Sequence, residues 1–171
     1  ISLDQLDCVS CFCSFGYICD FATGVESCMA CPGGKFASSV GAIECSSCPS
    51  GRYSFSRSSS CYLCPSGEIP NVYQTDCEKC PRGRFSISGA AACTFCDSNK
   101  GLVARKEGSS NCEYCGPGTF ADDVNNECWR CAAGKFSLGG SDICRDCNID
   151  EVSGEGSSSC GKCDPGSIPQ V

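Results

Sequence analysis

Residues 31–48 read CPGGKFASSVGAIECSSC, and this stretch holds the unit from which the chain is built. It opens at Cys31 with a Pro-Gly-Gly turn and a Lys-Phe pair, and it closes at Cys45, just before the next opening cysteine, Cys48. The following stretch, CPSGRYSFSRSSSCYLC at 48–64, repeats the same order. The sequence therefore predicts a series of cysteine loops joined by Cys-x-x-Cys pairs.

These pairs recur along the whole chain at a nearly constant step of 16 residues. They open at Cys8, Cys28, Cys45, Cys61, Cys77, Cys93, Cys112, Cys128, Cys144 and Cys160. Cys13 and Cys19 are two further cysteines inside the first, longer step. Counting from Cys13 puts Gly16 in the turn position, so Cys13 is the better opener of the first loop.

Each loop has a turn signature at fixed distances from its opening cysteine. Residues that tolerate a positive φ stand three positions on, so we expect a left-handed backbone there. They are Gly34, Gly51, Gly67, Gly83, Asn99, Gly118, Gly134, Asp150 and Gly166. Large apolar residues stand five positions on, where we expect them to cover the neighbouring disulfide; Gly101 is the exception.

A longer period groups the loops in threes. The loops from Cys31, Cys80 and Cys131 carry Gly-Lys-Phe or Gly-Arg-Phe. The loops after these end in SRSSSC, EGSSNC or EGSSSC, and the third kind ends in VESC, VYQTDC or VNNEC. We therefore expect an atypical N-terminal unit at 1–27 and three-loop repeats at 28–76, 77–127 and 128–171, the last one truncated.

Composition predicts a fold held by cross-links in an oxidising compartment. The 171 residues include 22 cysteines, and without them apolar residues fall from 41% to roughly 28%, too few for an ordinary core. We expect a small disulfide-rich fold, an elongated tandem-repeat rod of short hairpin-like loops with little regular secondary structure. Persistent disulfides place such a chain outside the cell or on its surface, in a secreted protein.

The same composition excludes several functions. There is no His, the commonest general base, so we expect no enzyme activity and no cofactor. A net charge of −7 disfavours nucleic acid as a partner. The apolar runs are too short for a membrane span. We interpret the sequence as a piece of a longer secreted chain, and we expect membrane attachment only through parts of that chain outside this sequence.

Zinc is the main alternative to disulfides, because Cys-x2-Cys-x12-Cys-x2-Cys resembles a four-thiolate site. The spacer between such sites would equal the spacer within them, and the acidic chain lacks the basic helices of nucleic-acid zinc modules. Redox motifs need a strand-to-helix junction, which these loops do not offer. Disulfides are therefore favoured.

Two connectivities fit the spacing: an interlocked pattern across neighbouring pairs, and a tandem pattern in which each loop is closed separately. The three-loop period favours the tandem pattern, because blocks of two pairs do not fit it. The tandem pairs are Cys13–Cys28, Cys31–Cys45, Cys48–Cys61, Cys64–Cys77, Cys80–Cys93, Cys96–Cys112, Cys115–Cys128, Cys131–Cys144 and Cys147–Cys160. Cys163, and one of Cys8, Cys11 and Cys19, would then have no partner within the segment.

Few other residues suggest a site. Asp122, Asp123 and Asn125 are weak candidates for calcium, since the spaced Asp-x-Asp-x-Asp-Gly loop is missing; we expect no metal. Ser58–Ser60 and Ser157–Ser159 are candidate O-glycan sites. Trp129 is interpreted as disulfide cover, with an interface anchor as the alternative. Four arginines at 52–84 form the one locally basic stretch.

The segments at 31–48 and 48–64 resemble the ephrin-receptor-like cysteine-rich repeats, which also have three-loop units. Single loops are similar to the first module of tumour necrosis factor receptor cysteine-rich domains, which share the Cys-Pro-x-Gly-x-Tyr/Phe opening. The resemblance covers 28–171 well and 8–27 loosely, and the Cys96 and Cys147 loops depart from it by opening with DSN and NID. It implies an extracellular module without catalytic residues.

Two functions remain. The first is an extracellular structural protein, a disulfide-closed rod that self-assembles into a fibre, appendage or surface coat; the three-loop decoration favours it. The alternative is the ectodomain of a receptor or adhesion protein that binds a protein ligand. Both make another protein the expected partner.

Overall fold

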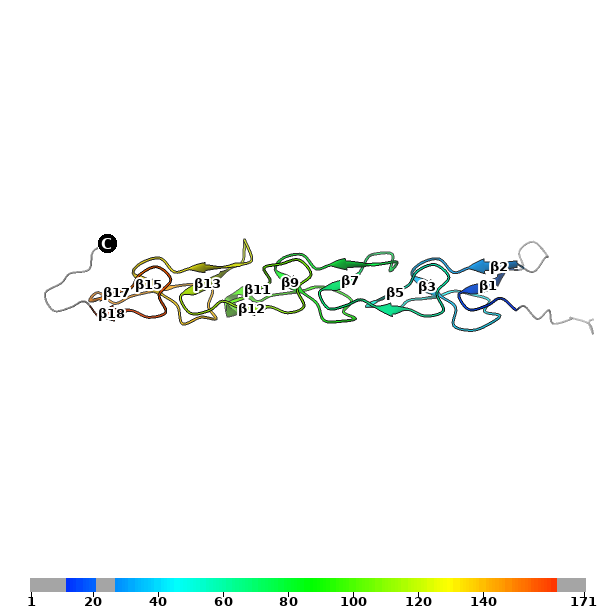
Figure 1. Cartoon of the computed structure of the whole chain (residues 1–171), viewed down its shortest axis with the longest axis horizontal. Coiled ribbons are helices and arrows are strands. Elements are labelled where there is room, and N and C mark those ends of the chain that lie inside the picture. The colour runs from blue at the N-terminus through cyan, green and yellow to red at the C-terminus, as the bar shows by residue number, and fades with distance from the viewer. Residues whose placement is uncertain (1–11, 21–26, 163–171) are drawn as a thin grey trace, which may run out of the picture. The chain divides into compact units, whose positions relative to one another are not determined.

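The computed structural model describes residues 12–20 and 27–162. This part of the chain forms nine two-stranded sheets, each a short hairpin within or closing one cysteine loop (Figure 1). The hairpins are β1 (Tyr17–Asp20) with β2 (Ser27–Ala30), β3 (Lys35–Phe36) with β4 (Ser46–Ser47), β5 (Arg52–Tyr53) with β6 (Tyr62–Leu63), β7 (Glu68–Pro70) with β8 (Cys77–Lys79), β9 (Arg84–Phe85) with β10 (Thr94–Phe95), β11 (Leu102–Val103) with β12 (Glu113–Tyr114), β13 (Thr119–Asp122) with β14 (Glu127–Arg130), β15 (Lys135–Phe136) with β16 (Arg145–Asp146), and β17 (Glu151–Val152) with β18 (Gly161–Lys162).

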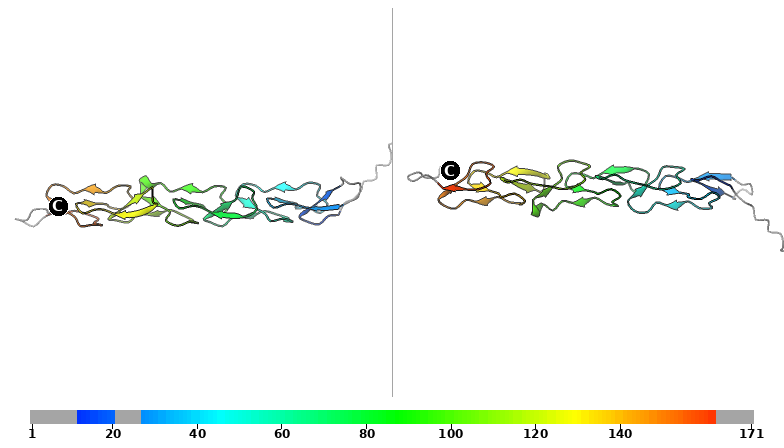
Figure 2. Two further views of the ribbon diagram at one scale, coloured as in Figure 1. Left: turned by 90° about the horizontal axis from the view of Figure 1, so that it is seen from above. Right: turned by 60° about the horizontal axis from the view of Figure 1, so that its bottom comes forward.

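Each hairpin follows from the loop sequence. The first strand begins directly after the turn, and the second strand contains the spacer of a Cys-x-x-Cys pair, so that Tyr53 faces Tyr62 and Arg52 faces Leu63. Among the described residues the single helical element is η1 (Ser98–Lys100), a turn of 3-10 helix; the remaining ribbon is strand or irregular (Figure 2). The expected scarcity of regular structure is confirmed.

Hairpin length repeats every three loops. The first strands of the loops opened by Cys13, Cys64 and Cys115 have four, three and four residues, and each of the others has two. The longer hairpins belong to the loops that end in VESC, VYQTDC and VNNEC. The boundaries of the three-loop repeats themselves stay a prediction.

Nine disulfides join described cysteines, and they follow one another in tandem. They are Cys13–Cys28, Cys31–Cys45, Cys48–Cys61, Cys64–Cys77, Cys80–Cys93, Cys96–Cys112, Cys115–Cys128, Cys131–Cys144 and Cys147–Cys160. Their Cα atoms lie between 5.4 and 5.8 Å apart, the ordinary range for a disulfide. The chain is thus a small disulfide-rich repeat protein. Below, each loop is named by the cysteine that opens it.

The interior consists of sulfur and small side chains. Most opening cysteines are buried, the exceptions being Cys96 and Cys147, and so are Ala37, Ser54 and Ser86. Val103, in the Cys96 loop, is the largest fully buried side chain in the described part of the chain, where it packs with Cys115 and Ala121. Because so little apolar area is buried, the disulfides must supply much of the stability.

The chain divides into two compact units whose sequences interleave. The first contains Ile1–Pro65, Ile69–Glu78 and Gly89–Ala91; the second contains Ser66–Glu68, Lys79–Ser88 and Ala92–Val171. Within each unit a loop bonds to the loop that follows it. In the first unit the Gly34 N–H donates to the Ser54 carbonyl (2.9 Å), and in the second the Gly118 N–H donates to the Ser137 carbonyl (2.7 Å).

Candidate functional site

Six of the expected turn glycines lie in described residues, and all of them have a left-handed backbone. Their φ values lie between 78° and 87°: Gly34, Gly51, Gly67, Gly83, Gly118 and Gly134. Gly16 has the same conformation (φ 79°), which agrees with Cys13 as the opener of the first loop. Gly166 lies outside the described residues.

The turn glycines have a second, stronger reason to be glycine. At Gly16, Gly34, Gly51, Gly67 and Gly118, the loop two positions further along the chain places a backbone carbonyl directly against the turn. A Cβ on Gly51 would overlap the Gly89 carbonyl oxygen, and a Cβ on Gly118 would overlap that of Gly156. At these turns a loop therefore contacts the next loop but one, which sequence periodicity does not reveal.

The expectation of a left-handed backbone was wrong at Asn99 and Asp150, neither of which has a positive φ. In the longer Cys96 loop the extra residues form η1, so the left-handed residue is Gly101 (φ 67°), two positions later than Asn99. Val103 then takes the place of the missing apolar residue, two positions after this glycine. The prediction was wrong at these two positions because it assumed that the left-handed residue always lies three positions after the opening cysteine.

In the eight described loops opened by Cys31 to Cys147, the sequence pattern did not predict a second left-handed position. It lies near the loop's far end and is occupied by Gly41, Arg57, Gln74, Gly89, Gly108, Asn126, Gly140 and Gly156. In most of these loops its N–H donates to the carbonyl of the preceding loop's opening cysteine, as Gly89 does to Cys64 (2.9 Å) and Arg57 does to Cys31 (2.9 Å). The aligned endings SRSSSC, EGSSNC and EGSSSC carried the signal, since Arg57 stands where the other two have glycine.

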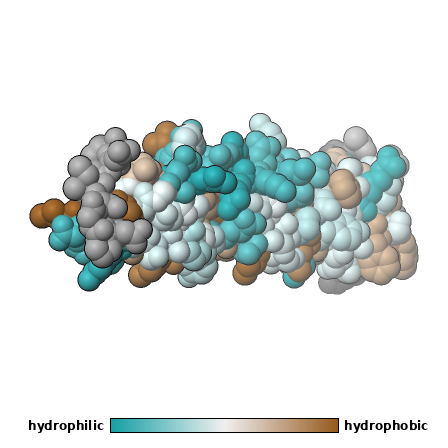
Figure 3. Space-filling view, turned by 60° about the vertical axis from the view of Figure 1, so that its left-hand side comes forward, coloured by the Kyte–Doolittle hydropathy of each residue, from teal (hydrophilic) through white to brown (hydrophobic). Residues whose placement is uncertain are grey.

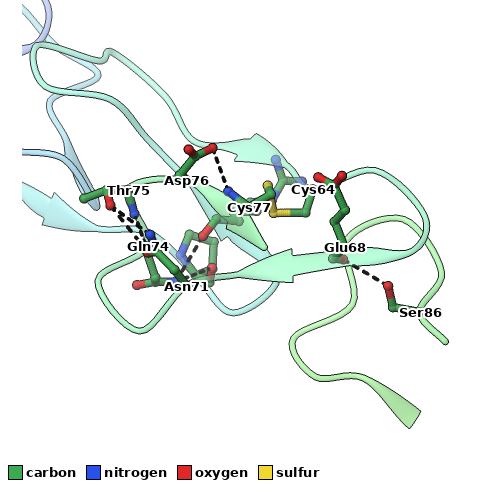
Figure 4. Close-up of a disulfide and its surroundings, with 10 residues drawn as sticks. Cys64, Glu68, Asn71, Gln74, Thr75, Asp76, Cys77 and Ser86 are labelled. Atoms are coloured by element: carbon green, nitrogen blue, oxygen red, sulfur yellow. Dashed lines mark hydrogen bonds between the residues drawn. A yellow bond between two sulfur atoms is a disulfide. The ribbon is translucent and has the colours of Figure 1, made fainter. Parts of the chain in front are cut away.

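A third position, directly after the large apolar residue, holds a small side chain that is buried in most loops. In three loops it is a serine whose hydroxyl donates to a carbonyl of the preceding loop. Ser54 bonds to Lys35 (2.9 Å) and Ser86 bonds to Glu68 (3.0 Å), as Figure 4 shows for the second pair. The sequence held this signal too, in Phe-Ala, Tyr-Ser and Phe-Ser pairs repeated at the loop period.

The long hairpin of the Cys64 loop is closed by side chains of its own tip. Asn71 accepts the Thr75 N–H on its Oδ1 (3.1 Å), and Asp76 accepts the Cys77 N–H (2.8 Å; Figure 4). The Gln74 side chain donates to the Pro49 and Arg52 carbonyls, both at 3.1 Å. In this longer hairpin the Gln74 side-chain amide therefore bonds to a preceding loop, whereas in the shorter loops the backbone N–H of the equivalent residue does so.

The calcium candidates are used within their own hairpin tip. Asp122 accepts the Val124 N–H (2.9 Å) and the Asn125 side-chain N–H (2.6 Å), and the hydrogen bond from Asn125 is the main reason that the pKa of Asp122 is lowered. In the described part of the chain no group of three or more His, Cys, Asp or Glu could hold a metal ion. Asp122 acts here as a turn-forming residue.

Two arginines of the basic stretch have partners, Arg82 in another loop and Arg84 within its own hairpin. Arg82 forms an ion pair with Glu127 (2.7 Å), and the Arg84 guanidinium lies 3.7 Å from the centre of the Phe95 ring. Arg82 reaches a carboxylate two loops further on.

Large apolar side chains lie mainly on the surface, where Figure 3 shows hydrophobic residues scattered among polar ones. Trp129 is half exposed, opposite Phe120 in the β13–β14 pair. The exposed set is Phe12, Phe15, Met29, Val40, Ile43, Phe55, Tyr62, Leu63, Val72, Tyr73, Ile87, Phe95, Tyr114, Val124, Trp129, Leu138, Ile143, Ile149 and Val152.

The serine-rich loop ends divide by exposure. Ser58 is buried and gives its carbonyl to the Ala37 N–H (3.2 Å), whereas Ser59, Ser60, Ser158 and Ser159 are exposed. Cys19 is disulfide-bonded. Cys163, Cys8 and Cys11 lie outside the described residues, so their expected pairing is not tested.

Open grooves lie between loops. One, of about 330 Å³, lies between the Gly83 turn and the Asp122–Asp123 segment, and its lining includes Val103. Another, of about 340 Å³, lies between the Gly51 turn and β7. Within the described residues, no helix has the length and apolar character that a membrane crossing needs.

Residues 16–59 match the family model described as tyrosine-protein kinase ephrin type A/B receptor-like, which confirms the predicted resemblance for this part of the chain. No curated protein matches the chain. The matched range runs from the first turn glycine, Gly16, to Ser59, two residues before the cysteine that closes the Cys48 loop. Together with the disulfides, the match indicates an extracellular cysteine-rich domain.

Proposed function

We propose that this segment is a protein-binding module outside the cell, in which covalently closed loops hold apolar and charged side chains in place for contact with other proteins. The observation that carries this proposal is the distribution of side chains. Sulfur, alanine and serine fill most of the described interior, with Val103 as its largest buried side chain, while most of the other large apolar side chains are exposed.

Such a distribution suits binding because the scaffold does not depend on the exposed side chains. Each loop is fixed by its disulfide and by backbone hydrogen bonds to its neighbours, so the outer residues are free to serve an interface. Aromatic residues and arginine supply most of the binding energy in protein interfaces. A rigid frame also lowers the entropy that binding costs. The role proposed is non-enzymatic.

Cross-linking on the native protein tests this function. A photo-reactive residue at Val72 or Trp129, both exposed, is expected to form protein adducts at the surface of the producing cell. The same residue at exposed, polar Ser59 is the matched control and is expected to give fewer adducts. Equal labelling from all three positions, or labelling of lipid and glycan alone, would contradict the proposal.

Self-assembly into a fibre or coat is the second candidate, and the period in hairpin length favours it. A longer hairpin on every third loop repeats the same feature at a constant step, as a lattice contact requires. Electron microscopy of native material tests it. An ordered polymer supports assembly, and dispersed particles that carry a second protein support the ectodomain.

A further inference from the structure

Arg57 has a backbone conformation that an arginine adopts only at a cost. Its φ is 66°, and the equivalent residues of the two related loops are Gly108 and Gly156. The hydrogen bond that this position makes, from its N–H to the preceding opening cysteine, needs no side chain. Glycine would adopt this φ without strain, yet the position holds arginine. We take this as an indication that the arginine side chain has a use.

The structure shows no internal use for that side chain. Arg57 is exposed, and within the described residues its guanidinium takes part in no hydrogen bond or ion pair. Arg52 differs, since it donates to the Cys61 carbonyl (3.1 Å). The Arg57 charge is therefore available to a partner.

An aromatic surface lies in the same disulfide-closed loop. Tyr53 and Tyr62 face each other across the hairpin with ring centres 5.9 Å apart, and Phe55 packs edge-on against Tyr53 at 5.4 Å. More than half of the Phe55 and Tyr62 side-chain surface is exposed. We call Tyr53, Phe55, Arg57 and Tyr62 the aromatic–arginine patch. The loop has no acidic residue, in a chain of net charge −7.

The Cys147 loop has the complementary character. Its turn, Asn148–Glu151, presents Ile149, which is 93% exposed, beside Asp150. The turn is held in shape because Asn148 donates to Glu151 (2.9 Å) and the Glu151 N–H donates to the Asn148 carbonyl (3.0 Å). Between Cys147 and Cys160 there are three acidic residues and no basic one.

We propose that the Asn148–Glu151 turn of one copy docks on the aromatic–arginine patch of a second copy. Ile149 packs on the Phe55 and Tyr62 rings, and the Asp150 carboxylate pairs with Arg57. The two surfaces differ, so the contact is heterologous and each added copy leaves one free surface of each kind. The inference rests on the proposed protein-binding function and names a second copy of the chain as the partner.

Sedimentation velocity of the purified, oxidised chain tests the contact. We expect the average mass to rise with protein concentration, and to rise less at high salt, because salt screens the Arg57–Asp150 pair. Arg57→Gly is expected to weaken association by about tenfold or more, the loss typical of an interface arginine. The same variant should unfold at an equal or higher temperature, since glycine favours this backbone.

Mixing two variants distinguishes a heterologous contact from other associations. Arg57→Gly keeps the turn and Ile149→Ser keeps the patch, so each should be monomeric alone while an equal mixture forms dimers and nothing larger. Lys106→Gln, which removes one positive charge from another exposed position, should associate like the wild type.

A wild-type chain that stays monomeric at every concentration would overturn the inference, and so would unimpaired association of Arg57→Gly. Neither result would remove protein adducts at Val72 and Trp129 on cells. The proposed function therefore stands or falls by that separate measurement.

Discussion

At the scale of single residues, the identity of a position is set by loops that lie elsewhere in the sequence. Gly51 is glycine because the Gly89 carbonyl, two loops on, occupies the space of a Cβ. Ser54 is small because it lies buried against the preceding loop, where its hydroxyl reaches Lys35. In a conventional core a position requires a large apolar side chain, whereas the contacts between these loops require a small side chain or none.

Gly51→Ala compared with Gly134→Ala separates backbone strain from steric overlap. Both glycines have a left-handed backbone (φ 78° and 80°), but no described atom lies within 4 Å of a Cβ at Gly134. We expect Gly134→Ala to cost about 1 kcal/mol and Gly51→Ala clearly more, because it must also displace a neighbouring backbone. Thermal unfolding under oxidising conditions measures both. Equal losses would show that the overlap is relieved without cost.

At the scale of the loop, part of the architecture could be predicted and part could not. Two connectivities fit the cysteine spacing, and the three-loop period favours the tandem order in which Cys31–Cys45 and its neighbours are paired. The shifted turn at Gly101 and the left-handed Arg57 depend on contacts made by other loops, and local spacing carries no record of those contacts. The aromatic–arginine patch that we propose could not be predicted from spacing, because what distinguishes Arg57 is its left-handed backbone.

Removal of the Cys48–Cys61 disulfide tests how independent a loop is. It closes a span of 13 residues, so the double substitution to serine should cost about 3 kcal/mol on the loop-closure estimate. We expect amide exchange to speed up in the Cys48 loop and also in the Cys31 loop, because Gly34 bonds to Ser54 and Arg57 bonds to Cys31. Faster exchange confined to residues 49–60 would show that the loops are held separately.

The tip of the β13–β14 hairpin should depend on pH. Hydrogen bonds from Asn125 and Val124 lower the pKa of Asp122, so the charged form stabilises the tip. This stabilisation is complete above the usual Asp pKa and is lost as the pH falls through the lowered value. Exchange of the Val124 amide, followed by NMR, should therefore speed up on acidification beyond its intrinsic pH dependence. Asp122→Asn should remove this additional response, and a response that persisted would assign it to another group.

At the scale of the whole molecule, contacts to the next loop but one change how stability adds up. In simple repeat proteins each unit touches only its neighbours, and stability is a sum of nearest-neighbour terms. Here Gly67 is covered by Gly108, and Gly118 by Gly156, so three successive loops are needed to complete one turn. Three is also the number of loops in the sequence period, so each kind of loop always meets the same kinds of neighbour.

Two deletions test whether folding depends on each loop meeting its usual kinds of neighbour. Deleting residues 77–127 removes one expected three-loop repeat and leaves every remaining loop with neighbours of its usual kinds. Deleting residues 80–95 removes one loop, so that the Cys64 loop meets a long hairpin two loops on in place of Gly108. We expect the first variant to fold with all its remaining cysteines paired, and the second to unfold at lower temperature with scrambled pairs. Peptide mapping measures the disulfide pairing of the two variants, and calorimetry measures their unfolding temperatures. If both variants paired and unfolded alike, the three-loop unit would have no structural role.

The tandem disulfides also decide how the chain carries tension. A pull on the two ends runs through each sulfur bridge and the two-residue spacer to the next one, so the residues inside a loop bear no load. The covalent path is then short and nearly inextensible. Reduction of one bridge would release the span of 13 to 16 residues that it closes, or about 40 Å of slack at the shorter length once the 5.7 Å already spanned is subtracted. The redox state of the surroundings therefore sets the mechanical length of the segment.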